Sequence, residues 1–158
     1  MKNVFILLMF ILLINCVAAD NNFYGTWVID KPFHIMGVLG DVDEEYESIK
    51  GITITYTEDK FILNSKTIIT IIKNPYYEEE IWDEEYLFDM TKGSATKPVT
   101  FEDLEIPVDQ KTIIRIRVKD ENKRVSMGTL VSGTWFYVIN HDTLILYWEG
   151  QHFKMKRR

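Results

Sequence analysis

The sequence predicts a mainly β domain, either a small barrel or a sandwich, from three observations. Residues that favour strands are abundant, and aromatic residues alone make up 13% of the chain. They alternate with polar residues in short runs at regular spacing, which is typical of antiparallel barrels and sandwiches. Helical patterns are scarce, so we expect about eight or nine strands with one or two helical turns.

The strand pattern recurs along the chain at 23–29, 52–57, 60–64, 66–73, 113–118, 134–139, 143–149 and 151–157. Asn140-His141-Asp142 is the clearest hairpin turn among them. Alternation in 113–118 is expected to send Ile114, Ile116 and Val118 inward and the two arginines Arg115 and Arg117 outward. The last hairpin is apolar on both faces, so both are expected to be covered, one by the interior and the other by a helix, the 74–90 segment or a partner.

Two short helical segments interrupt the strands. Asp41 is a suitable N-cap with Glu44 three residues later, and Gly51 is expected to end this helix at Lys50. A second helical turn is expected at 101–104.

The first 19 residues have the composition of a cleavable signal peptide. Lys2 supplies a positive start, an apolar run covers 4–14, and Val17-Ala18-Ala19 offers small residues before Asp20. The apolar run is too short to span a bilayer, which takes about 20 residues. We therefore expect residues 20–158 to form one exported domain without a transmembrane segment, located in the periplasm, at the surface or outside the cell. A lipid anchor at Cys16, in a weak lipobox-like context, is the alternative to simple cleavage.

The start of the mature chain carries a family resemblance. Gly25-Thr26-Trp27 resembles the Gly-x-Trp motif of lipocalins and related calycin barrels, and further similarity at 73–76 and 153–157 extends to uncharacterised exported lipocalin-like proteins of bacteria. The resemblance implies an antiparallel up-and-down barrel of about eight strands. It also implies that Arg157, or else Lys156, stacks across Trp27 at one barrel end. It brings no established activity.

The residues that usually carry catalysis are absent or scattered. His34, His141 and His152 lack the spacing of metal ligands, with His141 expected in a turn and His152 facing outward from a strand. The sequence has no Gly-x-Ser-x-Gly elbow, phosphate-binding loop or dinucleotide fingerprint. We expect no catalytic residues, metal or cofactor.

The charge and the aromatic residues of the chain are compatible with a protein partner. The net charge of −6 argues against nucleic acid. Six acids in 78–85 are interleaved with aromatic side chains, which makes this segment either a solvated acidic rim or a docking surface for a basic protein. The candidate surface residues are Tyr76, Tyr77, Trp82, Glu84 and Tyr86.

Two functions follow as expectations. The first is an exported, non-enzymatic binding protein that holds a small apolar ligand inside the barrel or at its mouth. The alternative is an exported inhibitor or immunity-type module that binds a basic protein through its acidic aromatic surface. Large interior side chains would leave little cavity and favour the alternative.

Overall fold

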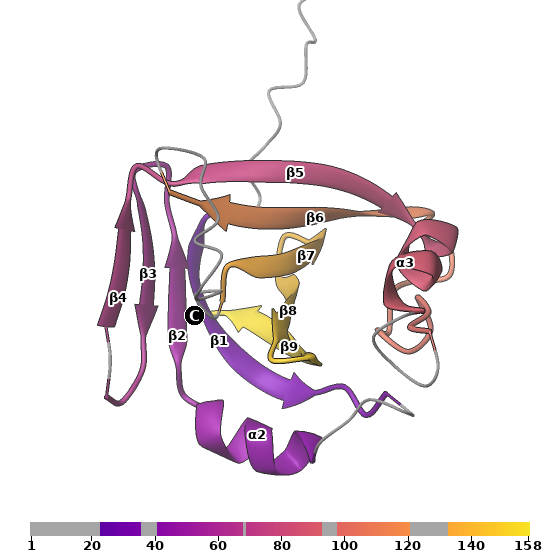
Figure 1. Cartoon of the computed structure of the whole chain (residues 1–158), viewed down its shortest axis with the longest axis horizontal. Coiled ribbons are helices and arrows are strands. Elements are labelled where there is room, and N and C mark those ends of the chain that lie inside the picture. Colours follow the sequence, from indigo (N-terminus) through magenta and orange to yellow (C-terminus); the bar gives the residue numbers. More distant parts are fainter. Residues whose placement is uncertain (1–22, 36–40, 68, 93–97, 121–132) are drawn as a thin grey trace, which may run out of the picture.

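The computed structural model describes residues 23–35, 41–67, 69–92, 98–120 and 133–158, so the expected signal peptide and Cys16 lie outside it. The described chain forms one antiparallel sheet of nine strands, curled into a half-barrel, with two helices (Figure 1). In chain order the elements are β1 (Gly25–Pro32), α2 (Val42–Ile49), β2 (Thr53–Tyr56), β3 (Lys60–Asn64), β4 (Ile69–Lys73), β5 (Tyr76–Asp83), α3 (Glu84–Thr91), β6 (Thr112–Lys119), β7 (Trp135–Asn140), β8 (Thr143–Trp148) and β9 (Gln151–Arg157).

The strand order is β4-β3-β2-β1-β9-β8-β7-β6-β5. The first strand therefore pairs with the last, as it would in a barrel, and strands that are neighbours along the chain otherwise pair antiparallel, except for β4 and β5. β4 and β5 are the two edges of this sheet, although they follow one another in the chain. A closed barrel was expected, and the described sheet is instead open between these strands. β5 pairs along its full length with β6, from Tyr76 opposite Lys119 to Asp83 opposite Thr112.

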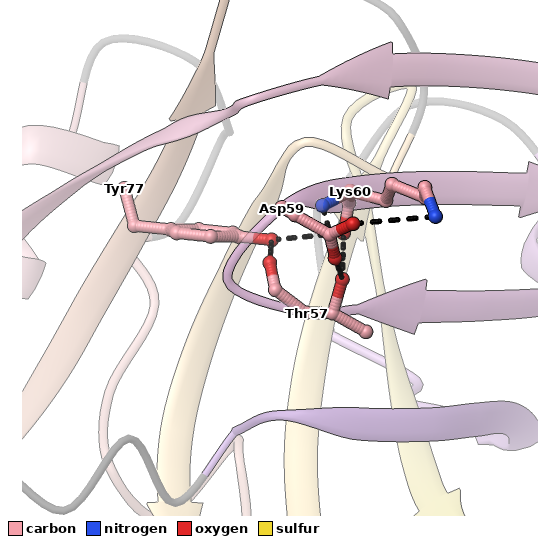
Figure 2. A network of polar contacts seen from close by, with 4 residues as sticks. All are labelled: Thr57, Asp59, Lys60 and Tyr77. Atoms are coloured by element: carbon pink, nitrogen blue, oxygen red, sulfur yellow. Dashed lines mark hydrogen bonds and ion pairs between the residues drawn. The ribbon is translucent and has the colours of Figure 1, made fainter.

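Polar contacts attach β5 to the turn between β2 and β3, at the edge where it does not pair with β4. The Tyr77 hydroxyl donates to the carbonyl oxygen of Thr57 at 2.7 Å and lies 3.3 Å from that of Lys60. Figure 2 shows these contacts beside the Asp59 carboxylate, which accepts from the Thr57 hydroxyl at 2.8 Å. The bond from Thr57, followed by that from Lys60, holds the pKa of Asp59 below its ordinary value. This network fixes the direction in which β5 leaves the rest of the half-barrel.

The concave face of the sheet is filled by large side chains. Its fully buried members include Trp27, Tyr56, Phe61, Phe136 and Phe153. Helix α2 packs against β1, and its Ile49 joins this core. The Asp41 carboxylate caps the helix by accepting from the backbone amides of Asp43 and Glu44 at 3.0 and 3.2 Å. The predicted cap and the predicted end at Lys50 are therefore confirmed.

The convex face carries a second apolar core. α3, at the far end of β5 and β6 (Figure 1), and the segment 99–106 cover this face. The members of this core are Phe33, Ile35, Trp82, Leu87, Val99, Phe101, Leu104, Ile106, Ile113, Tyr137 and Ile145. Both faces of the last hairpin are covered, as its apolar pattern predicts. The cover on the outer face comes from within the chain.

The acidic segment differs from its sequence-based interpretation. The two alternatives were a solvated acidic rim, with Trp82 and Tyr86 anchored inward on a helical turn, and a docking surface; in the structure residues 76–83 form a strand and the helix begins at Glu84. In β5 alternate residues face opposite sides, so Glu78 and Glu80 lie directly across from Arg117 and Arg115 of β6. Cross-strand ion pairs thus make a strand out of a run that is dense in charge.

Candidate functional site

The contact expected between the first and last strands is present. The Arg157 guanidinium carbon lies 4.5 Å from the centre of the fully buried Trp27 ring. The Trp27 indole donates to the carbonyl oxygen of Phe23 at 2.8 Å, and Arg157 donates to that of His141. Gly25 has a φ of +142°, and a Cβ at this position would collide with the guanidinium. Glycine therefore gives Arg157 access to the ring, and the arrangement is structural.

The five residues proposed as a partner surface do not form one surface. Trp82 is only 4% exposed and belongs to the convex-face core. Tyr77 is half-buried on the concave side, where its ring lies 5.0 Å from that of Phe23. Tyr76, Glu84 and Tyr86 are exposed. Because strand alternation sends Tyr77 and Trp82 to opposite faces, a single docking surface through all five is wrong as drawn.

A different group of side chains surrounds a recess of about 130 Å³ on the convex face. We call it the Trp135 pocket. Its lining residues are Trp82, Met90, Thr91, Val99, Arg115, Arg117, Trp135, Tyr137, Tyr147, Gly150 and His152. Trp135 and Tyr147 lie with ring centres 5.8 Å apart and planes inclined by 30°. Strands β5 to β9 and helix α3 all contribute, so the fold brings together residues that are far apart in sequence.

Arg115 lines the Trp135 pocket and is almost completely buried, with 4% of its surface exposed. Its Nη1 lies 2.6 Å from Oε2 of Glu80. The same oxygen accepts from the Trp82 indole at 3.1 Å. Burial raises the pKa of Glu80, but hydrogen bonds from Arg115 and Trp82 outweigh it and hold this pKa below its ordinary value. The guanidinium carbon also lies 4.2 Å from the centre of the Trp135 ring.

Arg117 has a longer ion-pair contact than Arg115. Its guanidinium carbon lies 4.5 Å from the Trp135 ring centre, and its Nη1 is 3.7 Å from Oε2 of Glu78. Glu78 has a closer partner in Lys119, whose Nζ lies 2.7 Å from Oε1. The Nε of Arg117 is buried and has no hydrogen-bond partner among the described residues. A buried donor without an acceptor is costly, and a ligand can supply one.

His152 presents a second orphaned group. It is 3% exposed, and neither ring nitrogen has a hydrogen-bond partner among the described residues. Its ring stacks on Tyr137 at 6.0 Å and meets Tyr147 edge-on at 5.2 Å. Burial lowers the pKa of His152 to about 4, so the imidazole is neutral at pH 7. His152 faces outward from its strand, as expected, but it is not solvated, because aromatic rings enclose it.

The residues of this site were missed by the search for catalytic patterns. A usable signal lay in the strands themselves, since Arg115 and Arg117 alternate in β6, as do Trp135 and Tyr137 in β7. The register pairs Arg117 with Trp135 and Arg115 with Tyr137. Once the pairing of β6 with β7 is known, two arginines on one strand beside two aromatic residues on the next predict a sheet face with cation–aromatic contacts.

The fold and site define a mainly β half-barrel with a small aromatic and cationic pocket on its outer face. Comparisons of the chain with family models, with curated proteins and with solved structures give no match. In the part of the chain that the structure describes, no helix has the length and hydropathy needed to cross a membrane. The same residues contain no group of three or more His, Cys, Asp or Glu side chains placed to hold a metal ion.

Proposed function

We propose that this protein is an exported, non-enzymatic binding protein of lipocalin-like fold that holds a small organic molecule in the Trp135 pocket. The observation that carries the proposal is the buried, unpartnered polar set of Arg117 Nε and both nitrogens of His152 beside aromatic walls. Ligand sites typically combine apolar and aromatic walls with a few placed polar groups. Export is supported by the signal-like start of the sequence.

The concave side is a poorer place for the ligand than the convex side. Five aromatic side chains there are completely or almost completely buried, namely Trp27, Tyr56, Phe61, Phe136 and Phe153. They pack on one another, with Tyr56 4.4 Å from Phe136 between ring centres. A core packed in this way has little space for a guest. We therefore move the expected ligand from the barrel interior to the outer-face pocket.

A second candidate function rests on a hollow between the start of α3 and the 101–111 segment. It is open and has a volume of about 840 Å³, and its charged lining consists of five carboxylates and one cation, namely Asp83, Glu84, Glu85, Glu102, Glu105 and Lys111. The neighbouring Tyr86 is 47% exposed. A concave surface with an excess of acidic groups attracts a partner of the opposite charge. An exported module that docks a basic protein at this hollow is the alternative.

Native mass spectrometry of the protein purified from its own host tests these two functions. We expect a bound small molecule on the wild-type protein and its loss from Trp135→Ala. Phe88→Ala is the matched control, because Phe88 is a 40% exposed aromatic residue on α3 that does not line the pocket. A small molecule retained equally by both variants, or none on the wild type, contradicts the pocket proposal. A co-purified basic protein lost on Glu84→Gln/Glu85→Gln supports the alternative.

A further inference from the structure

The charges around the Trp135 pocket do not balance. Arg115, Arg117 and Lys119 bring three cations to it, and Glu78 and Glu80 bring two carboxylates. Arg115 pairs with Glu80 at 2.6 Å, and Glu80 also feels the charge of Arg117, whereas Arg117 and Lys119 share Glu78 as their ion-pair partner. Among the described residues this cluster therefore holds one more cation than carboxylates, in a chain whose net charge is −6. A cationic site in an acidic protein favours an anion over a neutral or cationic ligand.

The unpartnered atoms specify the kind of anion. Arginine stays protonated in proteins, so its buried Nε is always a donor. A neutral His152 adds one donor and one acceptor. A carboxylate is an acceptor with two oxygens and can serve donors from two side chains at once. The pair Arg117 and His152 thus suits a carboxylate, with the other imidazole nitrogen left to accept from a ligand hydroxyl or a water.

The size and walls of the pocket limit the rest of the ligand. Its volume is about 130 Å³. An apolar cavity of about 150 Å³ accepts a benzene molecule, so a recess of this volume limits the enclosed part of the ligand to a single ring. Trp135 and Tyr147 are aromatic lining residues of this pocket, with ring centres 5.8 Å apart. Planar ligands gain from stacking and edge contacts with aromatic walls beyond the area that they bury.

We infer that the ligand of the Trp135 pocket is a small aromatic carboxylic acid, bound as the carboxylate by Arg117 and His152 with its ring against the aromatic walls. This inference rests on the proposed function, since it names the ligand class of the same pocket. Arg115 is a positioning residue here. Its charge is already matched by Glu80, and it supports the Trp135 ring at 4.2 Å.

The test is a titration of the wild-type protein at pH 7, followed by ligand-observed NMR, with three compounds: benzoate, benzamide and acetate. Benzamide has the ring without the charge, and acetate has the charge without the ring. We expect benzoate to bind about tenfold tighter than either, as a charge-assisted contact and a stacked ring each predict. If benzamide binds as tightly as benzoate, the inferred recognition of a carboxylate is wrong. If acetate binds as tightly as benzoate, the inferred recognition of an aromatic ring is wrong and the pocket is an anion site only.

Two variants locate the effect. Arg117→Met removes a lining cation at similar length and is expected to abolish the preference for benzoate over benzamide. Lys156→Met is the matched control, because Lys156 is a cation of β9 that pairs with Asp30, outside this charge cluster, and does not line the pocket; it is expected to keep that preference. Equal loss in both variants contradicts a contact with Arg117. The titration of the wild-type protein with the three ligands tests the inferred ligand class even if a variant fails to fold.

The outcomes separate this inference from the proposed function. If native mass spectrometry finds a pocket-bound molecule and benzoate shows no advantage, the ligand class is wrong and the binding function stands. If benzoate fails to bind and no small molecule accompanies the host protein, the inference and the binding function both fail.

Discussion

The guanidinium of Arg157 lies over the ring of Trp27, and this contact joins the two ends of the described chain. The two residues are also directly paired in the sheet, as β9 runs antiparallel to β1. Trp27 is completely buried, and Arg157 covers a side of the ring that water would otherwise reach. A cation over an indole contributes about 0.5–2 kcal/mol, depending on how dry the site is. The pair therefore stabilises the junction between the first strand and the last strand of the half-barrel.

Truncation of this pair measures its contribution. We expect Trp27→Ala to lower the free energy of unfolding by about 3–5 kcal/mol, as for other large buried aromatic residues. Arg157→Leu is expected to cost about 0.5–2 kcal/mol through the lost cation–aromatic contact. Urea unfolding followed by circular dichroism gives both values. Ile71→Ala, at a 53% exposed position on edge strand β4, is the control, and a Trp27→Ala cost no larger than that of the control contradicts the assignment.

The cap of α2 gives a second prediction. Asp41→Ala is expected to destabilise the protein by about 1 kcal/mol, because the amides of Asp43 and Glu44 lose their acceptor. Asp41→Asn keeps a capping oxygen and is expected to stay close to the wild type. The same unfolding measurement distinguishes them. Equal losses in both variants would show that the charge at the helix start matters more than the hydrogen bonds.

The sequence predicts those elements whose signal is local. The hairpin turn at 140–142, the α2 cap and the alternation of β9 are short-range patterns, and the structure has these elements where the patterns place them. β5 was missed because its four acids obscure its strand pattern until two arginines of β6 are placed opposite two of them. The open edge between β4 and β5 is likewise a matter of long-range pairing, on which single-strand alternation carries no information.

The candidate site was beyond local patterns for a similar reason. His152 faces outward from its strand, as alternation predicts, yet it is buried because Tyr137 and Tyr147 of two other strands enclose it. Outward therefore does not mean exposed in a sheet that is covered on both faces. The Gly-x-Trp motif identified a structural contact, and the pocket lies on the opposite side of the sheet.

The ion pair between buried Arg115 and partly exposed Glu80 gives a third prediction. Glu80→Gln removes the charge that compensates a 4% exposed arginine, so we expect a loss of about 1–3 kcal/mol. Arg115→Met/Glu80→Gln is expected to recover part of that loss, because the uncompensated cation is gone. A double-mutant cycle from urea unfolding measures the coupling. Additive losses in the two single variants would mean that the pair does not interact.

His152 predicts how stability depends on pH. Its pKa is about 4 in the folded protein, because burial disfavours the charged ring, against an ordinary value of 6.5 in the unfolded chain. As the pH falls below 6.5 the unfolded chain takes up a proton that the folded protein refuses, so folding becomes less favourable. The contribution of His152 to the free energy of unfolding is fully present above pH 6.5. It decreases as the pH falls from 6.5 to about 4 and changes no further below that. Each pH unit corresponds to about 1.4 kcal/mol, which gives a total loss of about 3 kcal/mol.

Urea unfolding between pH 7.5 and 5.5 isolates this effect, because carboxylates such as Glu80 and Glu105, whose pKa values are lowered in the folded state, lose their contribution only at more acidic pH. We expect the wild type to lose about 1 kcal/mol over that range. His152→Phe keeps an aromatic ring against Tyr137 and Tyr147 without a titrating group, and its stability is expected to stay flat. His34→Gln is the control, because the His34 side chain is 64% exposed and is expected to leave the wild-type slope unchanged. If His152→Phe retains that slope and His34→Gln removes it, the titrating group lies at the surface and the enclosure of His152 does not control the pH dependence.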